Sequence, residues 1–342
     1  MTQNEFTREA ALLDDEGRLS RAGWARQLLL RYERSLIAAP LRRIKECDYY
    51  CVLGAHFGIA LTIADNGYMG MLSATLIDLD SAKTTTHTET VLFPMGRFAL
   101  PSSSRQGSVR VNHRGTLMDF SVLDNGSRII KVDMPGFDNG TGLRGALVLS
   151  PAPSAESIVT AIPWKKNKNA FYYNQKTPSL DAEGVMRSGK RDFVFMKDEA
   201  FAVFDWGRGV WPASDTWYWA SASGIVDGKR FAFNAGCGFG DTSQGTENAL
   251  FVDGKLHKLG SVRFELDPGD YLKPWQLESD DGRLVLDLDP ILDRSARMNA
   301  LIYSSIQHQV FGTFRGTAIL DDGTSLSFQG LTGFAEKVKN RW

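Results

Sequence analysis

Asp-Gly and Asn-Gly dipeptides recur along this chain between short segments rich in Val, Ile, Leu, Phe and Thr. They favour the two-residue turns that join antiparallel strands, because these turns need positive φ angles. The clearest case is Ala249–Val252, then Asp253-Gly254, then Lys255–Leu259. The other turns of this kind are Asn66-Gly67, Asn125-Gly126, Asp227-Gly228, Asp281-Gly282 and Asp322-Gly323. The pattern predicts an all-β protein whose strands pair antiparallel with their sequence neighbours.

Helical signals are sparse, and the best one lies near the N-terminus. Ser20 is a possible N-cap, and Trp24, Leu28 and Ile37 follow with basic residues between them. Pro40 should end the pattern, because proline cannot continue the helical hydrogen-bond ladder. The sequence therefore predicts a short N-terminal helix.

The length of 342 residues allows two cores of typical domain size. Strand signals restart at Phe193-Val194-Phe195, after Gly189-Lys190. One open sheet holding all the predicted strands would be unusually large, and closure into barrels removes exposed edges. We predict an extension with the helix over residues 1–40 and two antiparallel β-barrel or curved-sheet modules packed together, over 41–190 and 191–342.

Charge and cysteine content exclude several classes of protein. Lys and Arg number 39 against 40 Asp and Glu, so no overall field attracts nucleic acid. No apolar run is long enough to span a membrane, and the first residues lack the features of a secretion signal. Cys47, Cys51 and Cys237 are odd in number, which favours reduced thiols and a cytoplasmic location. No metal-ligand spacing, Walker loop or Gly-x-Ser-x-Gly elbow occurs, so we predict neither metal nor cofactor.

Residues 205–224 hold half of the eight tryptophans of the chain, together with Arg208 and two aspartates. Tryptophan combines a large apolar area with a polar edge, and it is abundant in ligand sites as well as in cores. Gly207, Gly209 and Pro212 predict that the first nine of these residues form a tight irregular turn that presents Arg208. This segment marks the candidate site.

Downstream of that turn, period-two alternation places Trp217, Trp219 and Ser221 on one face of a predicted strand. Two tryptophans two positions apart form a continuous aromatic wall. The wall could line a pocket or fill a core, and Asp205 could form a structural salt bridge with Arg208. The sequence leaves these alternatives open.

Gly236, Gly238 and Gly240 leave one face of the next strand without side chains. Either the strand bends there at a barrel corner or another group passes close above it. No helix pattern follows, so the glycines are not a dinucleotide-binding fingerprint. Glu247 and Asn248 enter the following hairpin, either pointing inward or at a solvated strand start.

Several motifs together point to one family. They are Arg43–Tyr50, Asp205–Pro212, Gly238–Asp241 with Thr246–Ala249, and Gln309–Gly312. From about Leu12 to Trp342 the chain resembles the family catalogued as domain of unknown function 2804. Cys47 stands where that family leads us to expect a large aromatic residue, so we do not expect a catalytic thiol there.

More distantly, the layout resembles the lipocalin-related proteins that include carotenoid hydratases, tocopherol cyclase and some pericyclic cyclases. The resemblance implies two lipocalin-like modules and an apolar, often isoprenoid-like ligand held in or between them. Our first hypothesis is therefore an aromatic-lined β-barrel pocket that binds an elongated apolar small molecule, lipid- or isoprenoid-like. The predicted ligand-binding residues are Trp206, Arg208, Trp211, Trp217, Trp219, Phe239 and Asn248.

Two further hypotheses use the same region, and the sequence leaves open whether the protein is an enzyme. In one, a carboxylic acid protonates a polyene that is then hydrated or cyclised, and indole faces stabilise the cation by about 0.5–2 kcal/mol each. Glu247 and Asp241 are the first candidate acids, and Asp205 follows because Arg208 would favour its ionised form. The other is carbohydrate binding or glycoside cleavage, which requires two carboxyl groups about 5–9.5 Å apart.

Overall fold

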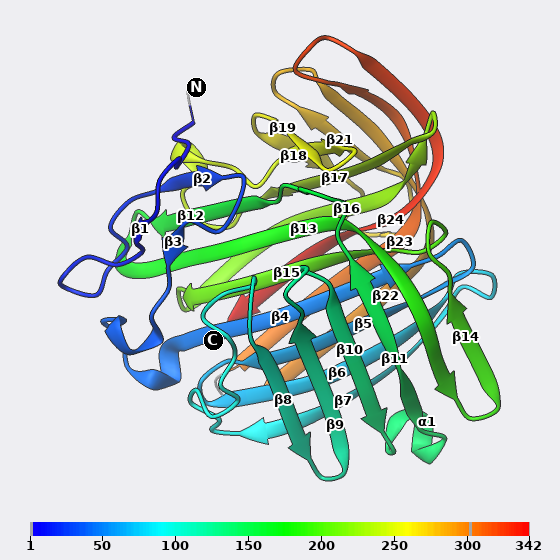
Figure 1. Ribbon diagram of the computed structural model, residues 1–342, viewed down its shortest axis with the longest axis horizontal. Helices are drawn as coiled ribbons and strands as arrows, with labels where there is room; N and C mark the ends of the chain where they lie inside the picture. Colours follow the sequence, from blue (N-terminus) through cyan, green and yellow to red (C-terminus); the bar gives the residue numbers. More distant parts are fainter. Residues whose placement is uncertain (1–2, 301–302, 342) are drawn as a thin grey trace.

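A computed structural model describes residues 3–300 and 303–341 of the chain. Strands account for 62% of it and helices for 4%, which confirms the all-β prediction. The strands form two large antiparallel sheets that pack against each other, one a nearly closed barrel and the other a half-barrel (Figure 1). A sheet that curls toward closure leaves less unpaired strand edge than a flat sheet would.

The first sheet has the main order β7-β6-β5-β4-β15-β13-β11-β10-β9-β8, and β2, β12 and β14 pair at its side. Most neighbours in this order are consecutive hairpins, as the turn signals predicted. The bounds are β2 Gly23–Ala25, β4 Ile44–Leu53, β5 Phe57–Asp65, β6 Met69–Asp78, β7 Lys83–Leu92, β8 Ser108–His113, β9 Thr116–Val122, β10 Arg128–Met134, β11 Leu143–Ser150, β12 Ile158–Trp164, β13 Asn167–Ser188, β14 Arg191–Phe195 and β15 Phe201–Val210.

The second sheet has the order β19-β18-β17-β16-β24-β23-β22-β21-β20. Its bounds are β16 Ser214–Val226, β17 Lys229–Cys237, β18 Ala249–Val252, β19 Lys255–Lys258, β20 Val262–Glu265, β21 Trp275–Ser279, β22 Leu284–Ala300, β23 Tyr303–Ile319 and β24 Ser325–Arg341. The chain passes from one sheet to the other between Val210 and Ser214, later than residue 190. The division into domains at residue 190 stays a prediction.

The quoted Asp-Gly and Asn-Gly dipeptides all join consecutive antiparallel strands, which confirms these hairpin predictions. At the β18–β19 turn Asp253 has φ 47° and Gly254 has φ 80°. The β16–β17 turn repeats this at Asp227, with φ 51°, and Gly228, with φ 74°. Paired positive φ angles match the right-handed twist of the flanking strands.

The predicted N-terminal helix is wrong. Residues 3–40 form instead the short strands β1 (Ala10–Ala11), β2 and β3 (Leu30–Arg31) and a 3-10 turn over Arg34–Leu36. β2 pairs with β12 and buries Trp24, which is 4% exposed. Pairing with an existing sheet edge satisfies the backbone and buries the apolar side chains, so tertiary packing overrides the weak local preference for helix.

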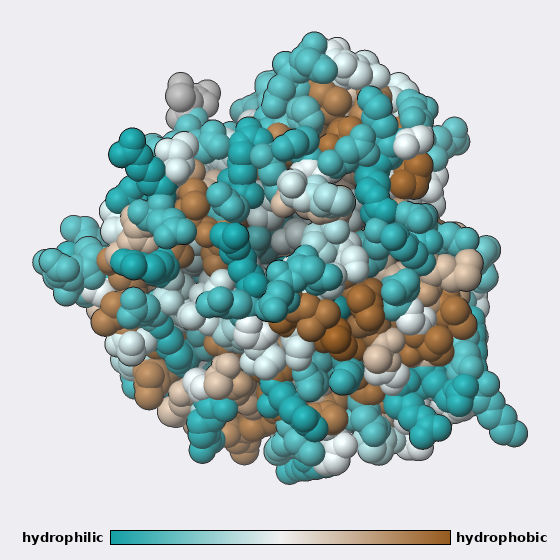
Figure 2. All heavy atoms as spheres, in the orientation of Figure 1, coloured by the Kyte–Doolittle hydropathy of each residue, from teal (hydrophilic) through white to brown (hydrophobic). Residues whose placement is uncertain are grey.

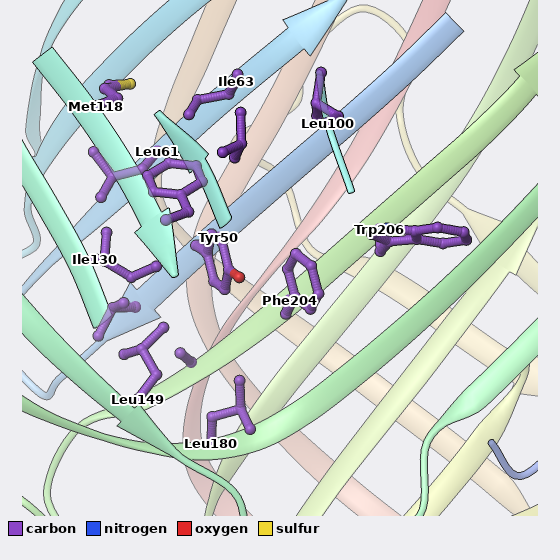
Figure 3. Close-up of a cluster of buried hydrophobic side chains, with 14 of the residues drawn as sticks. Tyr50, Leu61, Ile63, Leu100, Met118, Ile130, Leu149, Leu180, Phe204 and Trp206 are labelled. Carbon is purple, nitrogen blue, oxygen red and sulfur yellow. The ribbon is translucent and has the colours of Figure 1, made fainter. Parts of the chain in front are cut away.

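Each sheet encloses its own apolar core, and a third cluster lies between the sheets. The first core fills the barrel with side chains that include Tyr50, Leu61 and Phe204 (Figure 3). The cluster between the sheets includes Trp219 and Phe334. Outside, the surface in this view is mainly hydrophilic, interrupted by separate apolar groups (Figure 2).

Neither a membrane-crossing helix nor a metal cluster occurs within residues 3–300 and 303–341. No helix there is long and apolar enough to span a bilayer. No three His, Cys, Asp or Glu side chains of that part of the chain are grouped to hold a metal ion.

Candidate functional site

A cavity of about 220 Å³ lies between the two sheets, beside the cluster that joins them. Strands of both sheets contribute to its wall. The lining residues that matter below are Cys47, Tyr49, Tyr172, Lys176, Asp205, Trp211, Trp217, Trp219, Gly236, Phe239, Glu247, Arg294, Gln307 and Glu336. Strand alternation explains which strand residues line the cavity. On each strand every second side chain points away from the core of its own sheet and toward the other sheet.

The aromatic wall follows the alternation predicted from the sequence. Trp217 and Trp219 on β16 face the cavity, whereas Tyr218 packs against the core of the second sheet. Phe239 completes the wall, with its ring centroid 5.1 Å from that of Trp217 and 5.5 Å from that of Trp211. Trp219 also belongs to the buried cluster between the sheets, so it serves both as core and as cavity lining.

A buried lysine ties carboxylates of the two sheets together at one end of the cavity. The Nζ of Lys176, on β13, lies 2.6 Å from Asp205 Oδ2 and 4.0 Å from Glu247 Oε2. It also sits 3.9 Å from the ring centroid of Trp219. Burial acts to lower the pKa of Lys176, but the two carboxylates outweigh it and raise that pKa. Lys176 is therefore a fixed positive charge within the site.

Glu247 is the carboxylate that the second sheet brings to this lysine. Burial raises its pKa, against the opposing effect of Lys176. Its Oε2 accepts a hydrogen bond of 3.1 Å from Asn174. A Cβ atom on Gly236 would lie 1.9 Å from Glu247 Oε1, so the missing side chain leaves room for this carboxylate. Of the two alternatives for the glycines of this strand, a close approach by another group applies at Gly236, and that group is Glu247.

A third carboxylate, Glu336 on β24, lies in the same cavity, and no cation of the described residues contacts it. Its Oε1 accepts from the indole N–H of Trp217 at 3.3 Å, and its Oε2 accepts from Gln307 at 3.3 Å and Gln309 at 3.2 Å. Burial raises the pKa of Glu336 to about 7. This carboxyl can therefore hold or release a proton near neutral pH.

The predicted turn that presents Arg208 is wrong. Residues 201–210 form the continuous strand β15, paired on one side with β13 and on the other with β4. Its alternation sends Asp205 to the cavity and Arg208 to the barrel interior, where Arg208 is 0% exposed. Arg208 lies 2.9 Å from Asp48 Oδ1 and donates to the Cys47 carbonyl, so Asp205 pairs with Lys176 instead.

Three other predicted site residues also lie outside the cavity lining. Trp206 packs in the barrel core beside Phe204 (Figure 3). Asp241 accepts from the backbone of Ser243 and lies 3.5 Å from Lys165. Asn248 is 0% exposed and ties the backbone of neighbouring strands together. The structure brings together Asp205, Trp211, Trp217, Trp219, Phe239 and Glu247.

Sequence reasoning missed Lys176, Glu336 and Tyr172, and two of them had a usable signal. Tyr172 lies between Phe171 and Tyr173 on β13, and Glu336 follows Phe334 two positions later on β24, whereas Lys176 lies between the polar residues Gln175 and Thr177. A charged residue inside an otherwise apolar strand is expected to have a buried partner. Cys47 also lines the cavity, but burial raises the pKa of its thiol well above the ordinary value.

Several solved structures share this fold at low sequence identity. CghA bound to Sch210972 has a TM-score of 0.57 and 11% identity, over 96% of this chain and 97% of CghA. Kievitone hydratase from Nectria haematococca has a TM-score of 0.50 and 10% identity, over 97% of this chain and 98% of its own. A putative AttH from Nitrosomonas europaea has a TM-score of 0.51 and 12% identity, over 91% and 96%. Identities this low establish the fold alone.

Sequence comparison gives the family. No curated protein matches the chain. The family model described as "Domain of unknown function (DUF2804)" matches residues 3–342, and the structural neighbours agree with the distant lipocalin-like fold. The chain therefore belongs to the DUF2804 family.

Proposed function

We propose that this protein binds an elongated, mainly apolar small molecule in the cavity between its two sheets. The observation that carries the proposal is a cavity of about 220 Å³ walled by Trp211, Trp217, Trp219 and Phe239. Aromatic walls bury apolar ligand surface, and a few convergent polar groups fix its orientation. The polar end of the ligand lies beside the charged residues Lys176, Asp205, Glu247 and Glu336.

The first test asks what the purified protein holds. Native mass spectrometry should detect a bound small molecule, and an environment-sensitive apolar dye should bind at one site and be displaced by that molecule. Absence of both a bound molecule and a saturable dye site would refute the proposal.

Matched substitutions locate the binding site. Trp217→Ala removes an aromatic wall of the cavity and should weaken dye binding at least about tenfold, which corresponds to about 1.4 kcal/mol. Trp217→Phe keeps most of the apolar area and should weaken it by less than about threefold. Equal affinities of the wild-type protein and Trp217→Ala would place the dye elsewhere and count against the cavity.

A second candidate is acid-catalysed hydration or cyclisation of a polyene, and the surroundings of Glu336 favour it. Arg294 donates to the Oε1 atom of Gln309, so the amide nitrogen of Gln309 must face Glu336. The indole N–H of Trp217, which contacts the other oxygen of Glu336, can also act only as a hydrogen-bond donor. A protonated Glu336 finds no acceptor on Trp217 or Gln309, which leaves its O–H to the cavity or to the amide oxygen of Gln307. A structural neighbour is itself a hydratase by name, which also supports this candidate.

The predicted acids fare differently as candidates for this chemistry. Glu247 lines the cavity and has a raised pKa, so it remains a candidate acid. Asp205 lines the cavity in a salt bridge of 2.6 Å with Lys176, so its carboxylate is already engaged by that side chain. Asp241 lies outside the cavity lining; burial raises its pKa, but the hydrogen bonds with Ser243 and the charge of Lys165 together outweigh burial and leave that pKa lowered.

Deuterium labelling separates binding from catalysis. The co-purified ligand is incubated with enzyme in deuterated water, and mass spectrometry follows carbon-bound deuterium or added water. The second candidate requires incorporation that Glu336→Gln lowers at least about a hundredfold, the usual range for loss of a general acid. No incorporation, or equal incorporation by the variant, would remove it. A cytoplasmic location and the absence of a nucleic-acid partner stay predictions.

A further inference from the structure

The wall of the cavity carries more carboxylates than cations. Among the described residues that line it, the carboxylates are Asp205, Glu247 and Glu336, and the cations are Lys176 and Arg294. Lys176 is shared between Asp205 and Glu247, so no cation in the part of the chain that the structure describes makes direct contact with Glu336. Burying an anion without a contacting cation is unfavourable, so a positive charge in the empty space would stabilise the wall.

The same cavity already shows how it accommodates an ammonium group. The ammonium of Lys176 lies 3.9 Å from the ring centroid of Trp219 and 2.6 Å from Asp205. Indole faces attract cations through their quadrupole, and the attraction strengthens where water is excluded. Around Glu336, the rings of Trp211, Trp217 and Phe239 line the remaining space. Carboxylate and aromatic ring are thus available to a second, external ammonium.

We propose that the ligand of this cavity carries a positive charge, a protonated amine or quaternary ammonium on an apolar body, held between Glu336 and the aromatic wall. The inference rests on the proposed binding function and narrows its ligand class. An anionic head group fits poorly, because of the two cations in the described lining Lys176 is paired with carboxylates and Arg294 already donates to Gln309. Arg208 points into the barrel core.

Protonation of Glu336 should make the affinity of the cavity for cations depend on pH. Its pKa is raised to about 7 by burial, so it is partly protonated at neutral pH. A quaternary ammonium, whose own charge never titrates, binds best to the carboxylate form. Its affinity should rise as pH increases from about 6 to about 8 and then level off. Among the described residues, the charged or titratable groups that face Glu336 are Lys176, Asp205, Glu247, Arg294, Cys51 and, through Gln309, Tyr49.

These neighbours do not reverse the direction of the pH effect. Lys176 stays protonated in this range because its pKa is raised. Burial also raises the pKa of Glu247, so deprotonation of Glu247 would strengthen cation binding in the same direction as Glu336. Burial and neighbouring groups raise the pKa of Tyr49 well above its ordinary value, so it remains neutral.

The test uses three ligands with one apolar chain and different head groups: octyltrimethylammonium, 1-octanol and octanoate. Affinities of the full-length protein are measured by isothermal titration calorimetry at about pH 6 and about pH 8. We expect octyltrimethylammonium to bind at least about tenfold tighter than 1-octanol at the higher pH, and octanoate to bind more weakly than both. The preference should shrink at least about threefold at the lower pH.

Variants assign the preference to Glu336. Glu336→Gln should reduce the ratio of the ammonium to the alcohol affinity at least about fivefold and abolish most of its pH dependence. The control Glu278→Gln makes the same chemical change at an exposed side chain on β21 and should leave the ratio unchanged. Thermal melting confirms that each variant is folded, and Glu247→Gln gives a second folded variant of the cavity.

The outcomes separate the inference from the function on which it rests. Equal binding of 1-octanol and octyltrimethylammonium, both weakened by Trp217→Ala, would overturn the inference and support apolar binding. An ammonium preference that both Glu336→Gln and Glu247→Gln leave unchanged would also overturn it. Binding of none of the three ligands, together with no dye site, would refute the proposed function and the inference with it.

Discussion

Replacement of Lys176 by methionine tests the charged end of the cavity most directly. The side chain is 4% exposed and lies 2.6 Å from Asp205, on β15, and 4.0 Å from Glu247, in the segment before β18. Methionine keeps much of the apolar stem but removes the ammonium, and so leaves two mostly buried carboxylates, 18% and 14% exposed, without the cation that contacts both. Removal of one partner of a buried pair costs about 3–5 kcal/mol. We expect Lys176→Met to lower the free energy of unfolding by that amount at neutral pH.

The assay is urea denaturation followed by far-ultraviolet circular dichroism, because tryptophan fluorescence would report the altered surroundings of Trp219. The control Arg187→Met breaks an exposed pair with Asp192, whose side chains are 49% and 38% exposed. Such surface pairs contribute about 0–1 kcal/mol. The difference between the two variants isolates the effect of burial.

Two further measurements make the reasoning refutable. Lys176→Met combined with Asp205→Asn should recover at least about 1 kcal/mol relative to Lys176→Met alone, because the neutral amide needs no counter-charge. The loss should shrink as pH falls through the raised pKa of Glu247, because protonation removes one uncompensated charge. A Lys176→Met loss below about 1 kcal/mol, equal to that of Arg187→Met, would refute a buried charge cluster.

Three other substitutions or reactions test separate features. The pKa of Glu336 is about 7 in the folded protein and ordinarily 4.5, so the free energy of unfolding should fall by about 3 kcal/mol as pH rises from about 4.5 to above 7. Glu336→Gln should remove this pH dependence of stability, measured by urea denaturation at several pH values. Gly236→Ala places a Cβ 1.9 Å from Glu247 Oε1 and should weaken dye binding and destabilise by about 1–3 kcal/mol; unchanged binding and stability would contradict the close approach. Cys47 and Cys51, whose thiol pKa values are raised by burial, should resist iodoacetamide in the native protein and react in urea, as peptide mass mapping would show.

Local turn chemistry carried most of the fold prediction. Asp253-Gly254 and Asp227-Gly228 adopt the positive φ angles that their side chains tolerate, whatever the rest of the chain does. The same local logic failed near Ser20, where a helix-like pattern forms strand β2 because it pairs with the edge at β12. The glycines around Arg208 predicted a turn, which is wrong. Gly209 instead allows the close approach of β13, because a Cβ atom on Gly209 would lie only 2.1 Å from the carbonyl oxygen of Phe171.

The sequence by itself determined that the chain folds as antiparallel hairpins and that Trp217 and Trp219 share one strand face, because turns and alternation depend only on near neighbours. Only the tertiary structure decided that Lys176 meets Asp205 and Glu247, and that Glu336 shares their cavity. These side chains come from β13, β15, the segment before β18, and β24. Their meeting depends on how two curved sheets pack, which no local pattern of residues encodes.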